Sequence, residues 1–139
     1  MKYYELIEHT ADIGVRVSGG DLKQVFVNTA KAMFDIIAES CKACDSLKLK
    51  KFDIKIESED QEELLVNWLN ELLSLFEAKE TLFKEFKIDS LTDKQLIANA
   101  FGCPRENCII KTEIKAATYH ELKIEKVGQG FKAQVIFDV

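Results

Sequence analysis

Polar residues that could carry out chemistry gather in three short segments of this 139-residue sequence. The segments are 8–14 (EHTADIG), 114–120 (IKAATYH) and the last two residues, Asp138 and Val139. Both histidines of the chain, His9 and His120, fall in the first two segments. Aspartate carboxylates are ligands that hard divalent cations such as Ca²⁺ and Mg²⁺ prefer. The residue types therefore raise the question of whether these segments meet in space.

A predicted hairpin at the end of the chain links the second and third segments. Residues 121–126 and 131–138 alternate in the manner of strands, and residues 127–130 (VGQG) are typical of a hairpin turn. Counting back from this turn places Tyr119 opposite Asp138 and His120 opposite Phe137. Directly opposed residues have Cβ atoms about 4.5–5.5 Å apart. The end of the chain is thus predicted to lie beside the IKAATYH segment.

Asp138 lies on the strand face opposite that of Phe137 and Val139, and the terminal carboxylate is expected one residue further on. Neighbouring carboxylates repel one another unless a positive charge lies between them. If Asp12 approaches this group, the cluster is rich in oxygen and suits a divalent cation. The alternative is a solvated chain end, in which Asp138 is an edge charge and Asp12 caps a turn with help from Thr10.

A hydrolase that acts by itself is disfavoured by the residues around the histidines. Such an enzyme needs a nucleophile and a group that orients its base. The hydroxyls available near His9 and His120 are those of Thr10, Thr118 and Tyr119. None of them lies in a nucleophile elbow or a glycine-rich loop. The two histidines are therefore either functional candidates or satisfied polar groups near the core.

The four cysteines form two local pairs. Cys41 and Cys44 are spaced as C-x-x-C, and Cys103 and Cys108 as C-x-x-x-x-C. Four thiolates from two loops could bind structural zinc, but the second spacing is wider than that of the common zinc knuckle. Intracellular chains often carry reduced thiols without a ligand. We therefore expect inert loop cysteines ahead of a zinc site, and a disulfide is the least favoured alternative.

The charge balance argues against direct RNA binding. The chain has 19 basic and 24 acidic residues, a net charge of −5 and only two arginines, Arg16 and Arg105. Proteins that bind nucleic acid by neutralising phosphates are usually basic. No run of about 18 uncharged apolar residues is present, and residues 1–8 lack the apolar core of a secretory signal. We expect a cytoplasmic protein that works through a protein partner, without strong nucleic-acid or membrane binding.

Two amphipathic helices and several strands must position these segments. One helix is predicted after Asp21, with Gln24 at the capping-box position, and another after Ser58, with Gln61 at that position. Their apolar stripes are read as core packing. Strands are predicted at 3–7, 13–17, 47–57 with a bulge near residues 50–51, 83–88, 96–101, 121–126 and 131–138. This order indicates an α+β fold over 1–139, one compact domain with two helices on a mostly antiparallel or mixed sheet.

Four segments of the sequence resemble the archease family. They are EHTADIG at 8–14, LLVNWLNELL at 64–73, IKAATYH at 114–120 and VIFDV at 135–139, in the family's order and spacing. The resemblance spans nearly the whole chain and implies the archease fold. It also implies a divalent-cation site made by Asp12, Asp138 and Val139, with Ca²⁺ favoured and Mg²⁺ or Mn²⁺ as alternatives. Lys115 is a further functional candidate, and the four cysteines do not belong to the family pattern.

The same resemblance implies an accessory role and no catalytic activity of the chain's own. Archeases activate the RtcB-type RNA ligase in tRNA splicing or RNA repair, where they promote guanylylation of the ligase and multiple turnover. The alternative implied by the family is a chaperone-like modulator of other RNA-modifying enzymes, such as tRNA methyltransferases. An acidic chain fits either role, because both work through a protein partner.

Overall fold

The computed structural model describes residues 3–8, 12–42 and 48–139. In chain order the elements are β1 (Tyr4–Glu8), β2 (Asp12–Gly19), α1 (Leu22–Ile37), β3 (Ala38–Cys41), β4 (Lys50–Glu57), α2 (Gln61–Lys79), β5 (Thr81–Leu91), β6 (Gln95–Pro104), a 3₁₀ helix (Arg105–Asn107), β7 (Cys108–Ile110), β8 (Ala116–Val127) and β9 (Gly130–Asp138). Every strand pairing in this described part is antiparallel. The predicted α+β class is confirmed.

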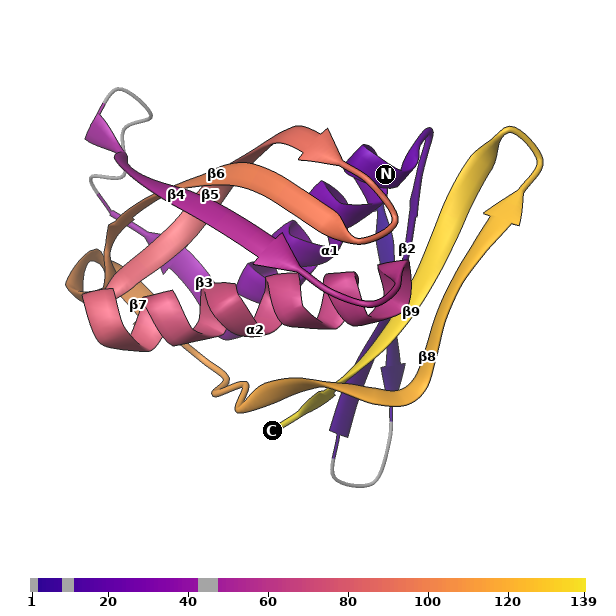
Figure 1. The fold of residues 1–139 in the computed structure, drawn as a ribbon. Helices are drawn as coiled ribbons and strands as arrows, with labels where there is room; N and C mark the ends of the chain where they lie inside the picture. Colours follow the sequence, from indigo (N-terminus) through magenta and orange to yellow (C-terminus); the bar gives the residue numbers. More distant parts are fainter. Residues whose placement is uncertain (1–2, 9–11, 43–47) are drawn as a thin grey trace.

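The strands form three sheets, and the two helices lie between the three-stranded and the four-stranded sheet (Figure 1). The order is β1-β2-β9-β8 in the four-stranded sheet, β4-β6-β5 in the three-stranded sheet and β3-β7 in the two-stranded sheet. Helix α1 packs on β2 and β9 and also on β5, so it lies between the two larger sheets. Helix α2 packs on β8 and on the three-stranded sheet. A single apolar core therefore joins all of these elements.

The first helix begins where the sequence predicts. The Asp21 carboxylate caps it and accepts a hydrogen bond from the Gln24 N–H at 2.8 Å. The Gln24 side chain donates to Asn28 at 2.8 Å, so only one half of the predicted capping box forms. The indole N–H of fully buried Trp68 in α2 donates to the Phe26 carbonyl in α1 at 3.0 Å. This bond satisfies the polar atom of a large core side chain and ties the helices together.

The predicted capping box of the second helix is wrong by two residues. The cap is Asp60, whose carboxylate accepts from the Glu63 N–H at 2.8 Å. The Glu63 carboxylate in turn accepts from the Glu59 N–H at 3.2 Å. The Ser58 hydroxyl is engaged elsewhere, because it accepts from the Asn67 side chain at 2.9 Å. An aspartate at the helix start also suits the positive end of the helix dipole.

The predicted bulge near residues 50–51 is also wrong. Strand β4 begins at Lys50 and pairs with β6 in an unbroken register, from Lys50 opposite Gly102 to Glu57 opposite Gln95. The apolar alternation changes phase because Leu49 precedes the strand; Leu47 lies outside the described residues. The irregular pairing is instead between β5 and β6, where the register shifts twice.

Two short strands were not predicted. Strand β3 directly follows α1, and strand β7 directly follows the 3₁₀ helix. The two strands pair with each other. The strand predicted to end at residue 101 continues to Pro104 as β6, and the 3₁₀ helix follows it. Across the described ranges, no helix is both long enough and apolar enough to cross a membrane.

We predict that Asp60→Ala lowers the free energy of unfolding by about 1 kcal/mol, because the first turn of α2 loses its cap. Urea unfolding followed by circular dichroism measures this change. Glu59→Ala is the matched control, since Glu59 is exposed and lies outside the helix. An equal loss of stability in both variants would contradict the assignment of Asp60 as the cap.

Candidate metal centre

Asp12 and Asp138 lie directly opposite each other. Asp12 is the first residue of β2 and Asp138 the last residue of β9, and the two are Cα partners in the antiparallel pairing. Opposed residues point to the same face of a sheet, with Cβ atoms about 4.5–5.5 Å apart. Asp12 is half-buried and Asp138 is exposed. The fold therefore places two carboxylates side by side at one end of the four-stranded sheet.

Val139 follows this pair and is half-buried. Its side chain packs against the hydrophobic core, and its backbone directly follows that of Asp138. In the described part of the chain, neither Asp12 nor Asp138 forms an ion pair with a basic side chain. The donors available here are all oxygens, and this chemistry fits a hard cation of the Ca²⁺ or Mg²⁺ type.

Lys115 is attached to the same end of the sheet through its backbone. Its N–H donates to the Asp138 carbonyl at 2.8 Å, and the next residue, Ala116, is the Cα partner of Asp138 in β8. The Lys115 side chain is exposed and lines an open pocket of about 520 Å³ between α2 and the start of β8. Glu77 and Glu113 line the same pocket. The Lys115 backbone is thus bonded to that of Asp138, while its side chain lies in the pocket beside α2.

The predicted register of the C-terminal hairpin is wrong beyond its first residues. Lys126 lies opposite Phe131, as the turn predicts, and the pairing holds to Lys123 opposite Gln134. It then shifts, so that Thr118 faces Ile136 and Ala116 faces Asp138. Neither Tyr119 opposite Asp138 nor His120 opposite Phe137 is found. The cause is a bulge that places extra residues of β8 between Thr118 and Lys123.

Side-chain bonds stabilise this bulge. Glu121 has a positive φ of 51°, and its carbonyl accepts from the Gln134 side chain at 2.9 Å. The Thr118 hydroxyl donates to the Ile136 carbonyl at 2.9 Å and accepts from the His120 N–H at 3.3 Å. These contacts replace ladder bonds that the shifted strand cannot make. The bulge is therefore stabilised by specific hydrogen bonds, and it determines which residue of IKAATYH lies opposite Asp138.

The bulge also moves the aromatic residues of the segment away from the aspartates. His120 is exposed, and its Nε2 lies 3.7 Å from the Glu121 carboxylate. Tyr119 lies near the start of α2. Its pKa is raised, first by desolvation of the partly covered phenol and then by the negative charges of Glu63 and Asp60. His9 lies outside the described residues. Of the two functional candidates among the described residues, Lys115 is the one that is bonded to Asp138, through its backbone N–H.

Asn70 in α2 holds the start of β8 in place. Its side-chain N–H₂ donates to the Ala117 carbonyl at 3.1 Å, and its side-chain oxygen accepts from the Ala117 N–H at 2.8 Å. No role was predicted for this residue, although it lies within the 64–73 segment. Its residue type is a possible signal, because a side-chain amide offers both N–H donors and an acceptor oxygen and can therefore clamp a backbone.

Gly14 allows close packing behind Asp12. A Cβ atom at this position would lie 2.6 Å from Ile136 Cδ1 and 3.2 Å from Ile7 Cβ. Gly14 faces Ile136 across the β2–β9 pairing and Ile7 across the β1–β2 pairing. A side chain here would force the Ile136 and Ile7 side chains to shift. The glycine of EHTADIG thus leaves room for these two side chains behind the strand that carries Asp12.

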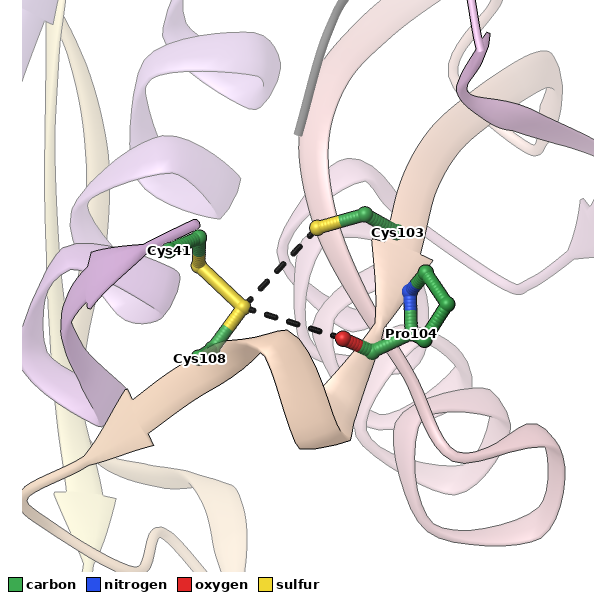
Figure 2. The surroundings of a disulfide bond; sticks show 4 residues. All are labelled: Cys41, Cys103, Pro104 and Cys108. Carbon is green, nitrogen blue, oxygen red and sulfur yellow. Dashed lines mark hydrogen bonds between the residues drawn. A yellow bond between two sulfur atoms is a disulfide. The ribbon is translucent and has the colours of Figure 1, made fainter. Parts of the chain in front are cut away.

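The cysteines are not the inert loop thiols that were expected. Cys41 and Cys108 form a disulfide across the β3–β7 pair, the arrangement that was least favoured. Cys103 Sγ lies 3.8 Å from Cys108 Sγ (Figure 2). The sequence could not show this convergence, because it depends on the unpredicted pairing of β3 with β7. Cys44 lies outside the described residues.

These features define a class of small α+β protein: two helices between antiparallel sheets, with paired aspartates at the ends of β2 and β9. Residues 4–139 match the model of the Archease protein family (MTH1598/TM1083). The chain therefore belongs to the archease family.

Relatives and solved structures agree with this assignment. Protein archease of Methanosarcina barkeri is 40% identical, over 99% of this chain and 97% of the relative. Protein archease of Pyrococcus abyssi is 39% identical over the full length of both chains. The solution structure of Methanobacterium thermoautotrophicum protein 1598 has a TM-score of 0.76 at 33% identity and covers both chains completely. The crystal structure of a Thermotoga maritima archease, described as a possible chaperone, has a TM-score of 0.64 at 23% identity, over 97% of this chain and 96% of that one; it supports the fold alone.

We predict that Asn70→Ala lowers the free energy of unfolding by about 1–3 kcal/mol, because the substitution leaves the Ala117 N–H and carbonyl without their partners. Urea unfolding gives the magnitude, and hydrogen exchange at the Ala117 amide reports the local opening. Glu71→Ala, at an exposed neighbouring position of α2, should change stability by less than about 0.5 kcal/mol. Unchanged exchange at Ala117 in Asn70→Ala would contradict the clamp.

Proposed function

We propose that this archease activates an RtcB-type RNA ligase through a divalent-cation site made by Asp12, Asp138 and Val139. The observation that carries the proposal is the direct pairing of Asp12 with Asp138, with Lys115 bonded to the Asp138 backbone. Three segments that are distant in the sequence therefore meet at one end of one sheet. The function itself is inferred from the archease family, whose pattern these residues match.

The arrangement of charges supports a cation at this site. Two carboxylates on one sheet face, with no basic partner in the described residues, repel each other until a positive charge lies between them. A cation such as Ca²⁺ needs six to eight oxygen ligands, so two aspartates and main-chain oxygens leave positions open for water or for a partner protein. When bound, the ion would supply positive charge that can stabilise phosphate oxygens. Asp12, being half-buried, would fix the ion's position, while exposed Asp138 would face the partner.

A protein partner suits the surface better than RNA alone. The net charge of −5 opposes the approach of phosphates, and counterion release provides little affinity to an acidic chain. The Lys115 backbone is bonded to that of Asp138, and its exposed side chain could contact an acidic group or a phosphate inside the partner's active site. In this arrangement the chain contributes charged groups to another enzyme's reaction and catalyses no reaction by itself.

A second candidate function is a chaperone-like role towards RNA-modifying enzymes such as tRNA methyltransferases. It is the alternative role that the resemblance to the archease family implies. This role requires binding to an incompletely folded client and does not require the cation. Suppression of client aggregation that is equal in Asp12→Ala and the unsubstituted protein, with no effect on ligation, would support this candidate over the first.

We predict that Asp12→Asn and Asp138→Asn each weaken Ca²⁺ binding by at least ~10-fold, equivalent to about 1.4 kcal/mol. Each substitution removes one of the two carboxylates without changing side-chain size. Isothermal titration calorimetry measures the affinity. Glu125→Gln is the matched control, because it removes the same charge from an exposed position in β8 near the hairpin turn, opposite Lys132. Equal weakening in Glu125→Gln would point to general charge attraction and would contradict the site.

We also predict that the chain increases the turnover number of limiting RtcB-type ligase on RNA with 2′,3′-cyclic-phosphate and 5′-hydroxyl ends. Asp12→Ala should abolish the stimulation, and Lys115→Met should reduce it while leaving Ca²⁺ affinity unchanged. Guanylylated ligase and ligated RNA are quantified on gels, with Glu125→Gln as the control. No stimulation by the unsubstituted chain would overturn the proposed function, and full stimulation by Asp12→Ala would overturn the role of the cation site. A phosphodiesterase signal from the chain alone would instead support an independent hydrolase.

A further inference from the structure

We propose that strand β4 pairs with β4 of a second copy of this chain and joins the two molecules into a symmetric dimer. Strand β4 lies at one end of the order β4-β6-β5, and in the described part of the chain its pairing partner is β6 alone (Figure 1). Its second edge therefore offers main-chain N–H and C=O groups to another strand. This surface is separate from the paired aspartates of β2 and β9, so the proposal does not depend on activation of a ligase.

The edge formed by β4 is regular along its whole length. Its pairing with β6 runs from Lys50 to Glu57 without a register shift. The other long edge strands, β5 and β8, each contain register shifts, and β1, β3 and β7 have five residues or fewer. Bulges and short length are features that prevent pairing at a sheet edge. Among the described edge strands, β4 is therefore the one best shaped to accept another strand.

The two faces of β4 differ in chemistry. One face carries apolar residues that point to the core, Phe52, Ile54 and Ile56. The other face is exposed and alternates in charge along Lys51, Asp53, Lys55 and Glu57. Neighbouring charges within the strand lie 4.0 Å and 3.6 Å apart, and both contacts are open to solvent. Exposed ion pairs of this kind contribute little by themselves, so these side chains are free to pair across an interface.

The order of these charges is self-complementary in an antiparallel pair. A two-fold axis beside Ile54 places this residue opposite its own copy. Asp53 then lies opposite the second copy's Lys55, and Lys51 lies opposite the second copy's Glu57. Symmetry repeats both contacts, so that every charge on this face meets an opposite charge. Directly opposed residues have Cβ atoms about 4.5–5.5 Å apart, which is close enough for their side chains to form ion pairs.

The same charges disfavour the neighbouring registers. With the axis moved to Asp53, Lys51 lies opposite Lys55; with the axis moved to Lys55, Asp53 lies opposite Glu57. Parallel pairing in register opposes each charge to itself. Like charges directly opposite each other destabilise a strand pair. The charges therefore select one register, while main-chain hydrogen bonds provide the affinity. Because the pairing uses the β4 edge of both copies, it closes at the dimer.

The local charge of β4 also suits a second copy. The segment 50–57 has three lysines and two acidic residues, a net charge of +1, whereas the whole chain has a net charge of −5. Two copies therefore repel each other at long range but not along this strand. At an ionic strength of about 0.15 M the Debye length is about 8 Å, so salt screens the long-range repulsion more than the directly opposed pairs.

The test is sedimentation equilibrium of the full chain at an ionic strength of about 0.15 M. We expect the unsubstituted chain to convert from monomer to dimer between about 1 μM and about 1 mM, the range of weak association. Asp53→Lys and Lys55→Glu each turn two attractive pairs into two repulsive ones, so each should raise the dissociation constant of the dimer at least ~10-fold. Lys87→Glu is the matched control, because Lys87 is exposed on the same sheet face but lies in β5, away from the β4 edge.

A mixture of the two variants gives the sharpest measurement. The lysine introduced by Asp53→Lys lies opposite the glutamate introduced by Lys55→Glu, and the remaining Lys55 and Asp53 also oppose each other. All the pairs are attractive again, so the equimolar mixture should dimerise as the unsubstituted chain does, although each variant alone does not. Circular dichroism checks that both variants are folded.

Three results would overturn the proposed pairing. The first is an unsubstituted chain that stays monomeric at every concentration, which needs no variant to be folded. The second is a mixture of Asp53→Lys and Lys55→Glu that stays monomeric while the unsubstituted chain dimerises. The third is a dimer that Lys55→Glu leaves intact or that Lys87→Glu weakens equally, because the contact would then lie elsewhere or reflect general charge.

Discussion

Two hydrogen bonds between the Asn70 side chain and the Ala117 backbone hold the start of β8 against α2. This attachment positions β8, the strand that borders the candidate metal centre on the far side of β9 from β2. Because Ala117 is fixed, the residue before it, Ala116, lies opposite Asp138, and the Lys115 N–H can donate to the Asp138 carbonyl. Helix α2 is in turn anchored in the core by Trp68. The exposed aspartate at the end of β9 is thus connected to the buried helices by a short chain of bonds.

Much of the fold could be predicted because its signals are local. Asp21 ahead of an apolar stripe gives the start of α1, and the glycine-containing segment 127–130 gives the turn of the last hairpin. The β8 bulge left no such signal, since the residue with positive φ is Glu121 and no glycine marks the position. Local patterns also misplaced the cap of α2, because both Ser58 and Asp60 can cap a helix and only tertiary contacts show that Ser58 bonds to Asn67.

Part of the candidate site could likewise be predicted from the sequence, and part could not. The sequence predicted that IKAATYH would lie beside the end of the chain, and Ala116 does lie opposite Asp138. That Asp12 faces Asp138 depends on β2 being the neighbour of β9, an adjacency that no short-range pattern encodes. The convergence of Cys41 with Cys108 depends likewise on a pairing between strands 67 residues apart. Non-local strand order is therefore the information that a single sequence lacked.

The two groups of potential ligands differ in what brings their members together. Asp12 and Asp138 are opposed through the β2–β9 pairing, and Asp138 is exposed at the end of the sheet, where a partner protein could complete the coordination of a hard cation. Cys41 and Cys108 are joined by a covalent bond across the β3–β7 pair, and both are half-buried. The carboxylates therefore have ligand atoms to offer to an ion, whereas the sulfurs of the disulfide are already bonded to each other and stabilise the pairing of two strands.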